Sequence, residues 1–188
     1  MNNYVFTSES VSEGHPDKIA DQISDAILDT YLKQDQQCRV ACESIVKDNR
    51  VIIAGEISSA ATVDHEAIAR QVVAEIGYTD EALGFTSTSF TFHDYISKQA
   101  DEIAAGVDRS VAEEQGAGDQ GLVFGYACNE TSVLLPAPIC YSNLITKRLA
   151  ELRHSGIVDW LRPDAKSQIS LRYDNDVPVA IETVVTST

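Results

Sequence analysis

Basic residues are scarce in this chain. Of its 188 residues, 14 are Lys or Arg and 29 are Asp or Glu, which gives a formal net charge of −15. A protein that wraps nucleic acid needs a basic face, so we expect no nucleic-acid partner. A small anionic ligand is compatible with this charge, provided that metal ions or a few placed cations neutralise it locally.

Long hydrophobic runs are also missing. The segment Val51–Gly55 has the length of a strand and is far too short to span a bilayer. The first ten residues contain neither the basic region nor the apolar stretch of a signal peptide. We therefore expect a cytoplasmic protein that does not enter a membrane. With 44% hydrophobic and 23% charged residues, the composition is that of an ordinary globular protein with a core.

Cysteine is present, but in no recognisable metal or redox pattern. The four cysteines are Cys38, Cys42, Cys128 and Cys140. Their spacing matches no zinc site, and a CxxxC pair on an extended segment is no redox motif. We interpret them as buried, reduced thiols.

The most informative segment is the run GHPDKIADQISDAILD, Gly14–Asp29. Pro16 suits the first position of a helix, which places His15 and Asp17 beside unpaired backbone N–H groups. Such a helix start attracts anions, above all phosphates, and a carboxylate beside it suits Mg²⁺. Taken alone, the segment is equally compatible with an ordinary helix start that happens to carry a His and an Asp.

A hairpin follows, with two carboxylates on one face. If the ladder closes at Val46 and Val51, paired residue numbers sum to 97, so Glu43 faces Ala54. Glu56 lies two residues from Ala54, and the two glutamates therefore share a face. Buried acids are rare unless they are paired or bind a metal, whereas an exposed face would need no such explanation. The spacing alone favours neither alternative.

The order of the expected elements repeats along the chain. The first half predicts a strand at Val5–Thr7, a helix at Pro16–Lys33, a hairpin of Arg39–Val46 and Val51–Ser58, a helix at Asp64–Ile76 and a strand at Ser87–Ile96. The second half predicts a strand at Leu122–Cys128, a helix from Pro138 to about His154 and a hairpin of Ser167–Tyr173 and Val177–Val185. We therefore expect an α+β fold of repeated strand–helix–hairpin units, whose sheets carry helices on one face. The apolar side of the second helix is expected to consist of Tyr141, Leu144, Ile145, Leu149 and Leu152.

The irregular stretch in the middle of the chain suggests a domain division. Residues 100–115 are rich in Ala, Gly and acids and have little amphipathic period, as is typical of a lid or a linker. We expect an N-terminal unit at 1–99, a loop at 100–115 and part of a second unit at 116–188. Because the sequence stops in a strand, we expect it to be shorter than the natural folding unit; alternatively, the helical remainder is dispensable.

Two further clusters carry polar residues at turns. The sequence GAGDQG, Gly116–Gly121, fits the pattern of a dinucleotide-binding loop but precedes a strand, so that interpretation fails and a glycine-rich turn presenting Asp119 remains. The second cluster, WLRPDAKSQ, places Arg162, Asp164 and Lys166 directly before a strand. Taken alone, either segment could be an ordinary turn.

Together, these segments resemble the S-adenosylmethionine synthetase (methionine adenosyltransferase) family in its bacterial form. Residues 6–29, 116–131 and 160–168 are ungapped matches to signatures of that family, in the expected order. The resemblance extends over Asn3–Thr188, whereas the enzymes of the family are about twice as long.

The resemblance implies a reaction and a set of site residues. The family forms S-adenosylmethionine from ATP and L-methionine and releases phosphate and diphosphate. The implied catalytic residues are His15 and Lys166; ATP would be bound by His15, Asp164, Ala165 and Lys166, and methionine by Glu56, Gln99 and Asp119. Asp17 would bind Mg²⁺, Glu43 would take part in a K⁺ site, and Gln99 to about Arg109 would belong to a mobile active-site loop.

The resemblance also implies an assembly. The family fold has three similar α+β units, and two subunits pack sheet against sheet with active sites at their interface, so we expect a homo-oligomer. A triphosphate carries about four negative charges, and few cations here could meet it: His15, Lys18, Arg162 and Lys166. We therefore expect no turnover by this chain alone. The alternative function is that of a non-catalytic partner that regulates a full-length synthetase.

Overall fold

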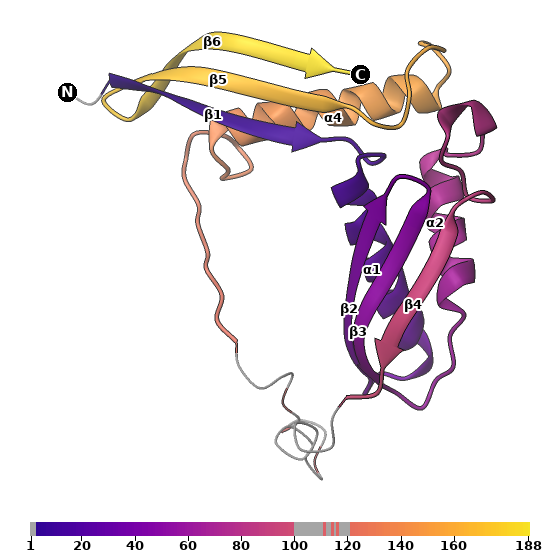
Figure 1. The fold of residues 1–188 in the computed structure, drawn as a ribbon. Coiled ribbons are helices and arrows are strands. Elements are labelled where there is room, and N and C mark those ends of the chain that lie inside the picture. Colours follow the sequence, from indigo (N-terminus) through magenta and orange to yellow (C-terminus); the bar gives the residue numbers. More distant parts are fainter. Residues whose placement is uncertain (1–2, 100–110, 112–113, 115, 117–120) are drawn as a thin grey trace. The chain divides into compact units, whose positions relative to one another are not determined.

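The computed structural model describes residues 3–99, 111, 114, 116 and 121–188 (Figure 1). The chain divides into two compact units. Unit 1 contains residues 1–18 and 124–188, and unit 2 contains residues 19–123. The mixed α+β fold expected from the sequence is confirmed, with helices packed on sheets in both units.

Unit 2 is built on a three-stranded sheet of order β2–β3–β4. The strands are β2 (Arg39–Lys47), β3 (Arg50–Ser58) and β4 (Thr91–Ser97); β2 and β3 form an antiparallel hairpin, and β4 runs parallel to β3. The helices are α1 (Pro16–Gln34), which begins in unit 1, and α2 (His65–Ile76), followed by a short 3₁₀ helix, η1 (Glu81–Leu83).

The core of unit 2 lies on one face of its sheet. The isoleucines of the α1 stripe, Ile19, Ile23 and Ile27, are almost fully buried with Val73 of α2 and Ile53 of β3. Burial of each such side chain contributes about 1.5–3 kcal/mol, which is sufficient to fix the helices on that face. The opposite face presents the remaining side chains of the strands to solvent.

Helix α2 begins and ends as its sequence predicts. The Asp64 carboxylate accepts a hydrogen bond from the Ala67 N–H, which caps the first turn. Gly77 follows the helix with φ of 108°, a left-handed conformation that favours glycine.

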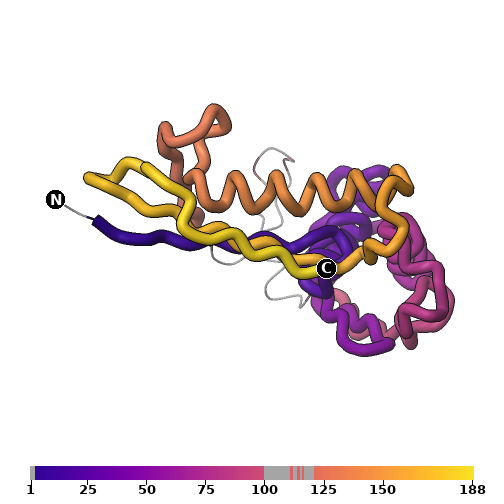
Figure 2. Tube along the Cα trace, turned by 90° about the horizontal axis from the view of Figure 1, so that it is seen from above, coloured from indigo at the N-terminus to yellow at the C-terminus, as the bar shows by residue number. Residues whose placement is uncertain are grey.

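Unit 1 is a three-stranded antiparallel sheet of order β1–β5–β6, covered on one face by a single helix (Figure 2). The elements are β1 (Asn3–Val11), α4 (Ala137–His154), β5 (Lys166–Asp174) and β6 (Val177–Ser187). Helix α4 packs on β1 and β5, over a small core of Ala137, Ile169, Leu171 and Tyr173.

The expected strand at Leu122–Cys128 is wrong. These residues form no strand, and the side chains of Val123 and Phe124 are almost fully exposed. The place beside β5 is taken by β1, which pairs with it along its whole length from Asn3 to Val11. A run of apolar residues with strand propensity thus predicts a strand here, but the run has no partner strand in the described structure.

The pairing of β1 with β5 also sets how the units divide. The sequence predicts boundaries near residues 99 and 116, but the first 18 residues belong to the same compact unit as residues 124–188. Nine pairs of residues, from Asn3 with Asp174 to Val11 with Lys166, join these distant parts of the chain. The first residues of the sequence therefore belong to the same spatial unit as its last part.

The buried side of α4 agrees only in part with its expected apolar side. Of the expected residues, Ile145, Leu149 and Leu152 are half-buried, and Ile145 packs against the small core. Tyr141 and Leu144 are exposed, and Ser142 and Thr146 are buried against the sheet instead. The Ser142 hydroxyl donates to the main-chain oxygen of Ser8 over 3.0 Å, and the Thr146 hydroxyl lies 3.0 Å from that of Ser10. Small hydroxyl side chains let the helix approach β1 closely, and this packing outweighs the apolar pattern.

Candidate functional site

Two turns predicted to carry site residues lie side by side in unit 1. One is the Ser12–His15 turn between β1 and α1, and the other is the Pro163–Ala165 turn before β5. Four hydrogen bonds join them: Ser12 N–H to Ala165 O (2.8 Å), Gly14 N–H to Pro163 O (3.1 Å), Ser12 Oγ to Pro163 O (2.6 Å) and Ala165 N–H to Ser12 Oγ (2.7 Å). The segments GHPDK and RPDAK, 149 positions apart from Gly14 to Pro163, therefore form one local structure.

Gly14 permits this close approach. A Cβ at this position would lie 2.3 Å from Pro163 Cβ and 2.4–2.6 Å from the main-chain carbon and oxygen of Pro163. No side chain fits there without moving the turn before β5. The glycine of the motif thus allows the two backbone segments to lie in contact.

His15 stands directly before the first residue of α1, with Pro16 at the first helical position as expected. Its Nδ1 accepts a hydrogen bond from the Asp17 N–H (3.2 Å), so it caps one of the donors of the helix start. In the neutral imidazole the proton must then reside on Nε2, because each ring nitrogen of that form is either donor or acceptor. Nε2–H is a donor suited to a phosphate oxygen.

Three of the expected site residues at these turns are exposed, and one is buried. The Asp17 carboxylate is 88% exposed and lies 3.8 Å from His15 Nδ1. Asp164 and Lys166 are exposed, whereas Ala165 is buried. Both main-chain polar groups of Ala165 bond to Ser12, so this residue joins the turns, and the exposed groups beside it are those that a ligand can reach.

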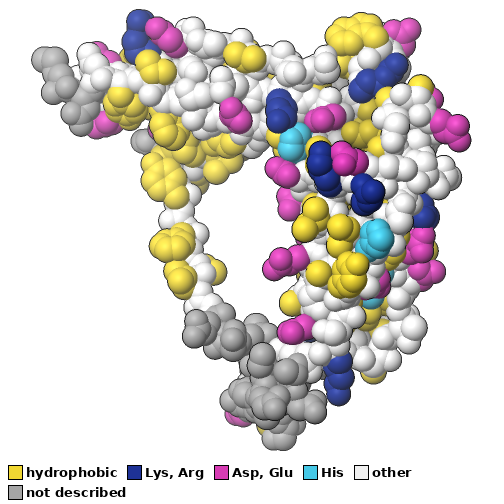
Figure 3. Space-filling model, in the orientation of Figure 1, with side chains coloured by type: hydrophobic (Ala, Val, Ile, Leu, Met, Phe, Trp, Pro, Cys, Tyr) yellow, Lys and Arg dark blue, Asp and Glu magenta, His cyan; other side chains and the backbone are white. Residues whose placement is uncertain are grey.

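Unit 2 presents Glu43 and Glu56 on the face of the sheet opposite the helices. The register is the expected one, with Glu43 opposite Ala54 and Val46 opposite Val51. Both glutamates are exposed, so of the two alternatives for this face the solvent-exposed one holds in this chain. Figure 3 shows acidic and apolar side chains together on the face of these strands.

Gln99, at the end of the described part of unit 2, is held by Arg39. The Arg39 Nε–H donates to Gln99 Oε1 over 3.0 Å. Because a guanidinium has no acceptor, the amide oxygen must face Arg39, and the amide N–H groups are the ones turned to other partners. Gln99 is thereby prepared to donate to an acceptor such as a carboxylate.

Asp119 and Arg109 lie outside the described residues, as does most of the loop expected at 100–115. Within the described part of the chain, no three His, Cys, Asp or Glu side chains gather closely enough to hold a metal ion by themselves. None of the described helices is both long and apolar enough to cross a membrane.

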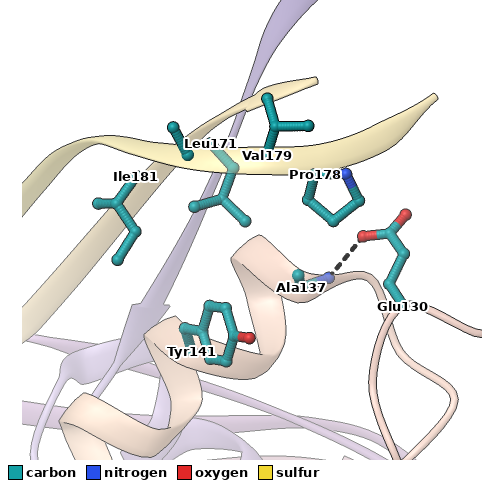
Figure 4. A pocket seen from close by; sticks show the side chains of 8 residues that line it. Glu130, Ala137, Tyr141, Leu171, Pro178, Val179 and Ile181 are labelled. Carbon is teal, nitrogen blue, oxygen red and sulfur yellow. Dashed lines mark hydrogen bonds between the residues drawn. The ribbon is translucent and has the colours of Figure 1, made fainter. Parts of the chain in front are cut away.

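A groove of about 530 Å³ lies elsewhere in unit 1, between α4 and the hairpin of β5 and β6 (Figure 4). Its lining is mainly apolar and includes none of the expected site residues: Glu130, Ala137, Tyr141, Leu171, Pro178, Val179, Ala180 and Ile181. The Glu130 carboxylate accepts bonds from the Ala137 N–H and the Tyr173 hydroxyl, and burial, together with this carboxylate, raises the pKa of Tyr173. The one acid of the groove thus stabilises the start of α4.

Comparison with known families decides the identity of the fold. Residues 3–101 match the model of the S-adenosylmethionine synthetase N-terminal domain, and residues 114–188 match that of the central domain. The chain belongs to the S-adenosylmethionine synthetase family. The resemblance carried by residues 6–29, 116–131 and 160–168 is thereby confirmed.

Sequence reasoning missed two residues that orient candidate site residues, one in each unit. Ser12 uses its hydroxyl both as donor and as acceptor to join the two turns, and Arg39 orients Gln99. The sequence offers only a weak signal for either, namely a hydroxyl two residues before the motif glycine and a cation at the start of a strand. Their partners are distant in sequence, so only the folded chain reveals them.

Proposed function

We propose that this chain takes part in forming S-adenosylmethionine from ATP and L-methionine, with release of phosphate and diphosphate. The observation that carries the proposal is the junction of the Ser12–His15 and Pro163–Ala165 turns by four hydrogen bonds. It gathers an imidazole donor, a helix start and a lysine at one end of unit 1, a combination suited to a polyphosphate.

The demands of the reaction fit these groups. The sulfur of methionine is already nucleophilic and needs no general base, while the leaving group at C5′ is the whole triphosphate. Catalysis then consists of positioning and of stabilising the charge that develops on the leaving oxygen. In the proposed roles, His15 donates from Nε2 near the breaking bond, and Lys166 places its charge on the phosphates, with Asp164 beside the nucleotide.

The methionine end is assigned to unit 2. Glu56 would pair with the ammonium group of the amino acid, and the amide N–H groups of Gln99, with Oε1 held by Arg39, would donate to its carboxylate. Asp119 and Arg109 belong to the same proposal.

The residues present suit the two cations that the family uses. Asp17 offers one exposed carboxylate beside a helix start, and Mg²⁺ binds through one or two carboxylates together with phosphate oxygens. Glu43 is the proposed contribution to the K⁺ site. When bound, Mg²⁺ would neutralise part of the triphosphate charge, which the sparse basic residues of this chain leave largely unmet.

A titration with tripolyphosphate and Mg²⁺, followed by ³¹P NMR, tests the phosphate end. We expect saturable binding by the native chain and about tenfold weaker binding by His15→Ala. His93→Ala, which removes an imidazole from β4, is the matched control and should bind like the native chain. Equal affinity of the two variants would refute the role of His15.

A specific observation favours a second role, in association. Ile45 is 61% and Tyr95 65% exposed on the face of the sheet that carries Glu43. An open sheet face with large apolar side chains is typical of an interaction surface. We propose that this face pairs with another copy of the chain, or with a full-length synthetase that the chain would then regulate.

A further inference from the structure

A charged cluster at the end of α4 holds the turn that carries His15. The Glu13 carboxylate uses one oxygen, Oε1, for two contacts. This oxygen accepts a hydrogen bond from Arg153 Nη2 and lies 2.7 Å from His154 Nε2. Arg153 and His154 are the last two residues of α4, and Glu13 is about 140 positions earlier in the chain. The contact therefore joins the end of the helix to the turn before α1.

This contact is unlike an ordinary surface ion pair. The side chains of Arg153 and Glu13 are 14% and 28% exposed, whereas the pair Arg148–Glu151 on the same helix is 64% and 49% exposed. Cations at a helix end usually interact with the last carbonyl groups or with the helix dipole. Here the Arg153 guanidinium reaches a carboxylate on another segment. A partly buried pair of this kind is less screened by solvent than an exposed one.

Glu13 lies between two residues that are already bonded to the turn before β5. Ser12 and Gly14, its two neighbours, are bonded through backbone and hydroxyl groups to Pro163 and Ala165. The side chain of Glu13 anchors the same turn to α4. Three successive residues are thus fixed to two different elements, and His15 follows directly.

We propose that Glu13, Arg153 and His154 are positioning residues that hold the His15–Asp17 segment against the turn of Asp164 and Lys166. They touch no ligand themselves; they restrict the turn so that His15 Nε2 and the start of α1 keep one orientation. The link to phosphate binding rests on the proposed function, whereas the restriction of the turn does not.

Hydrogen–deuterium exchange of the full chain tests the restriction directly. In Arg153→Leu we expect exchange at residues 12–18 to become about tenfold faster, while residues 137–150 of α4 exchange as before. Arg148→Leu, with the same change of charge on the same helix, should leave residues 12–18 unchanged. Arg153→Lys should restore part of the protection, because it keeps the charge and loses the planar fork of donors.

Glu13→Gln removes the charge of the other partner in the same contact and should also speed exchange at residues 12–18. This variant decides the question if Arg153→Leu does not fold. Unchanged exchange in these variants, or an increase spread evenly over unit 1, would overturn the proposal.

A titration of the same samples with Mg²⁺ and tripolyphosphate separates the two proposals. We expect about tenfold weaker binding by Arg153→Leu. If the native chain does not bind, the proposed phosphate site fails, while the exchange result still decides the role of the cluster. If the native chain and Arg153→Leu bind equally, the cluster does not position the ligand site.

Discussion

At the scale of single residues, the proposed phosphate end depends on a few atoms that fit together closely. His15 Nδ1 accepts from the Asp17 N–H, Ser12 bridges the two turns, and Gly14 lies against Pro163. The sequence predicts that His15 and Asp17 stand at a helix start, because proline and acidic residues mark that position. It does not predict Ser12, since a serine before a glycine is common in any turn.

Gly14→Ala should separate the two turns. The added Cβ would meet Pro163 at 2.3 Å, so the turn must shift and some of the four hydrogen bonds must lengthen or break. We expect a loss of about 1–3 kcal/mol in the free energy of unfolding, measured by urea denaturation. Gly125→Ala adds the same atom where nothing lies within 4 Å and serves as the control. Equal stability of both variants would contradict the close packing of the turns.

At the scale of elements, what could be predicted depended on whether the information was local. The hairpin of β2 and β3 has its register fixed by its own turn, and the expected pairing of Glu43 with Ala54 is confirmed. The strand expected at Leu122–Cys128 is wrong, and the apolar side expected for α4 is correct only in part. Both depend on β1, which comes from the far end of the sequence. The periodicity of a sequence describes one element and does not show which other element it packs against.

Substitutions on α4 distinguish the expected side of the helix from the observed one. Ser142→Val enlarges a fully buried side chain and removes its bond to Ser8, so it should reduce the free energy of unfolding by about 1–3 kcal/mol. Leu144→Glu changes an exposed side chain and should alter stability by less than about 0.5 kcal/mol. Urea denaturation of both variants checks this, and the reverse order of effects would favour the apolar side expected from the sequence.

Asp35 links the end of α1 to the segment after β3 and gives a pH-dependent contribution. Its carboxylate accepts from the Ser59 hydroxyl and from the N–H groups of Ala60 and Gln37, and these bonds hold its pKa below the usual value. A pKa that is lower in the folded chain stabilises it above the unfolded pKa of about 3.9, and this stabilisation is lost as the pH falls through the folded value.

Asp35→Asn should therefore reduce the free energy of unfolding more at pH 7 than at pH 2. Asp25→Asn, on the exposed side of α1, is the control for removal of one acidic side chain. Urea denaturation at both pH values measures the difference. A loss at pH 2 as large as that at pH 7 would show that ionisation of Asp35 is not the cause.

At the scale of the whole molecule, two features lead to predictions: the net charge and the exposed face of one sheet. The formal charge of −15 leaves few cations for a triphosphate, so we expect no formation of S-adenosylmethionine from ATP and methionine by this chain alone with Mg²⁺ and K⁺. A chromatographic assay for the product checks this. Robust product formation that is abolished in His15→Ala would overturn the argument from charge.

The open face of β2, β3 and β4 leads us to expect self-association. Ile45→Lys places a charge on this face and should shift the chain toward the monomer in sedimentation velocity. Leu144→Lys adds the same charge at an exposed position of α4 and should not. A native chain that stays monomeric at high concentration would contradict the proposed interface.

The central claim is that the turns of His15 and Lys166 form a single phosphate site, and a double-mutant cycle in the binding of Mg²⁺–tripolyphosphate tests it most directly. We predict that His15→Ala and Lys166→Ala each weaken binding, and that the double variant loses less than the two separate losses combined, because both groups act on one ligand. Unchanged affinity in both single variants, or two fully additive losses, would contradict the account.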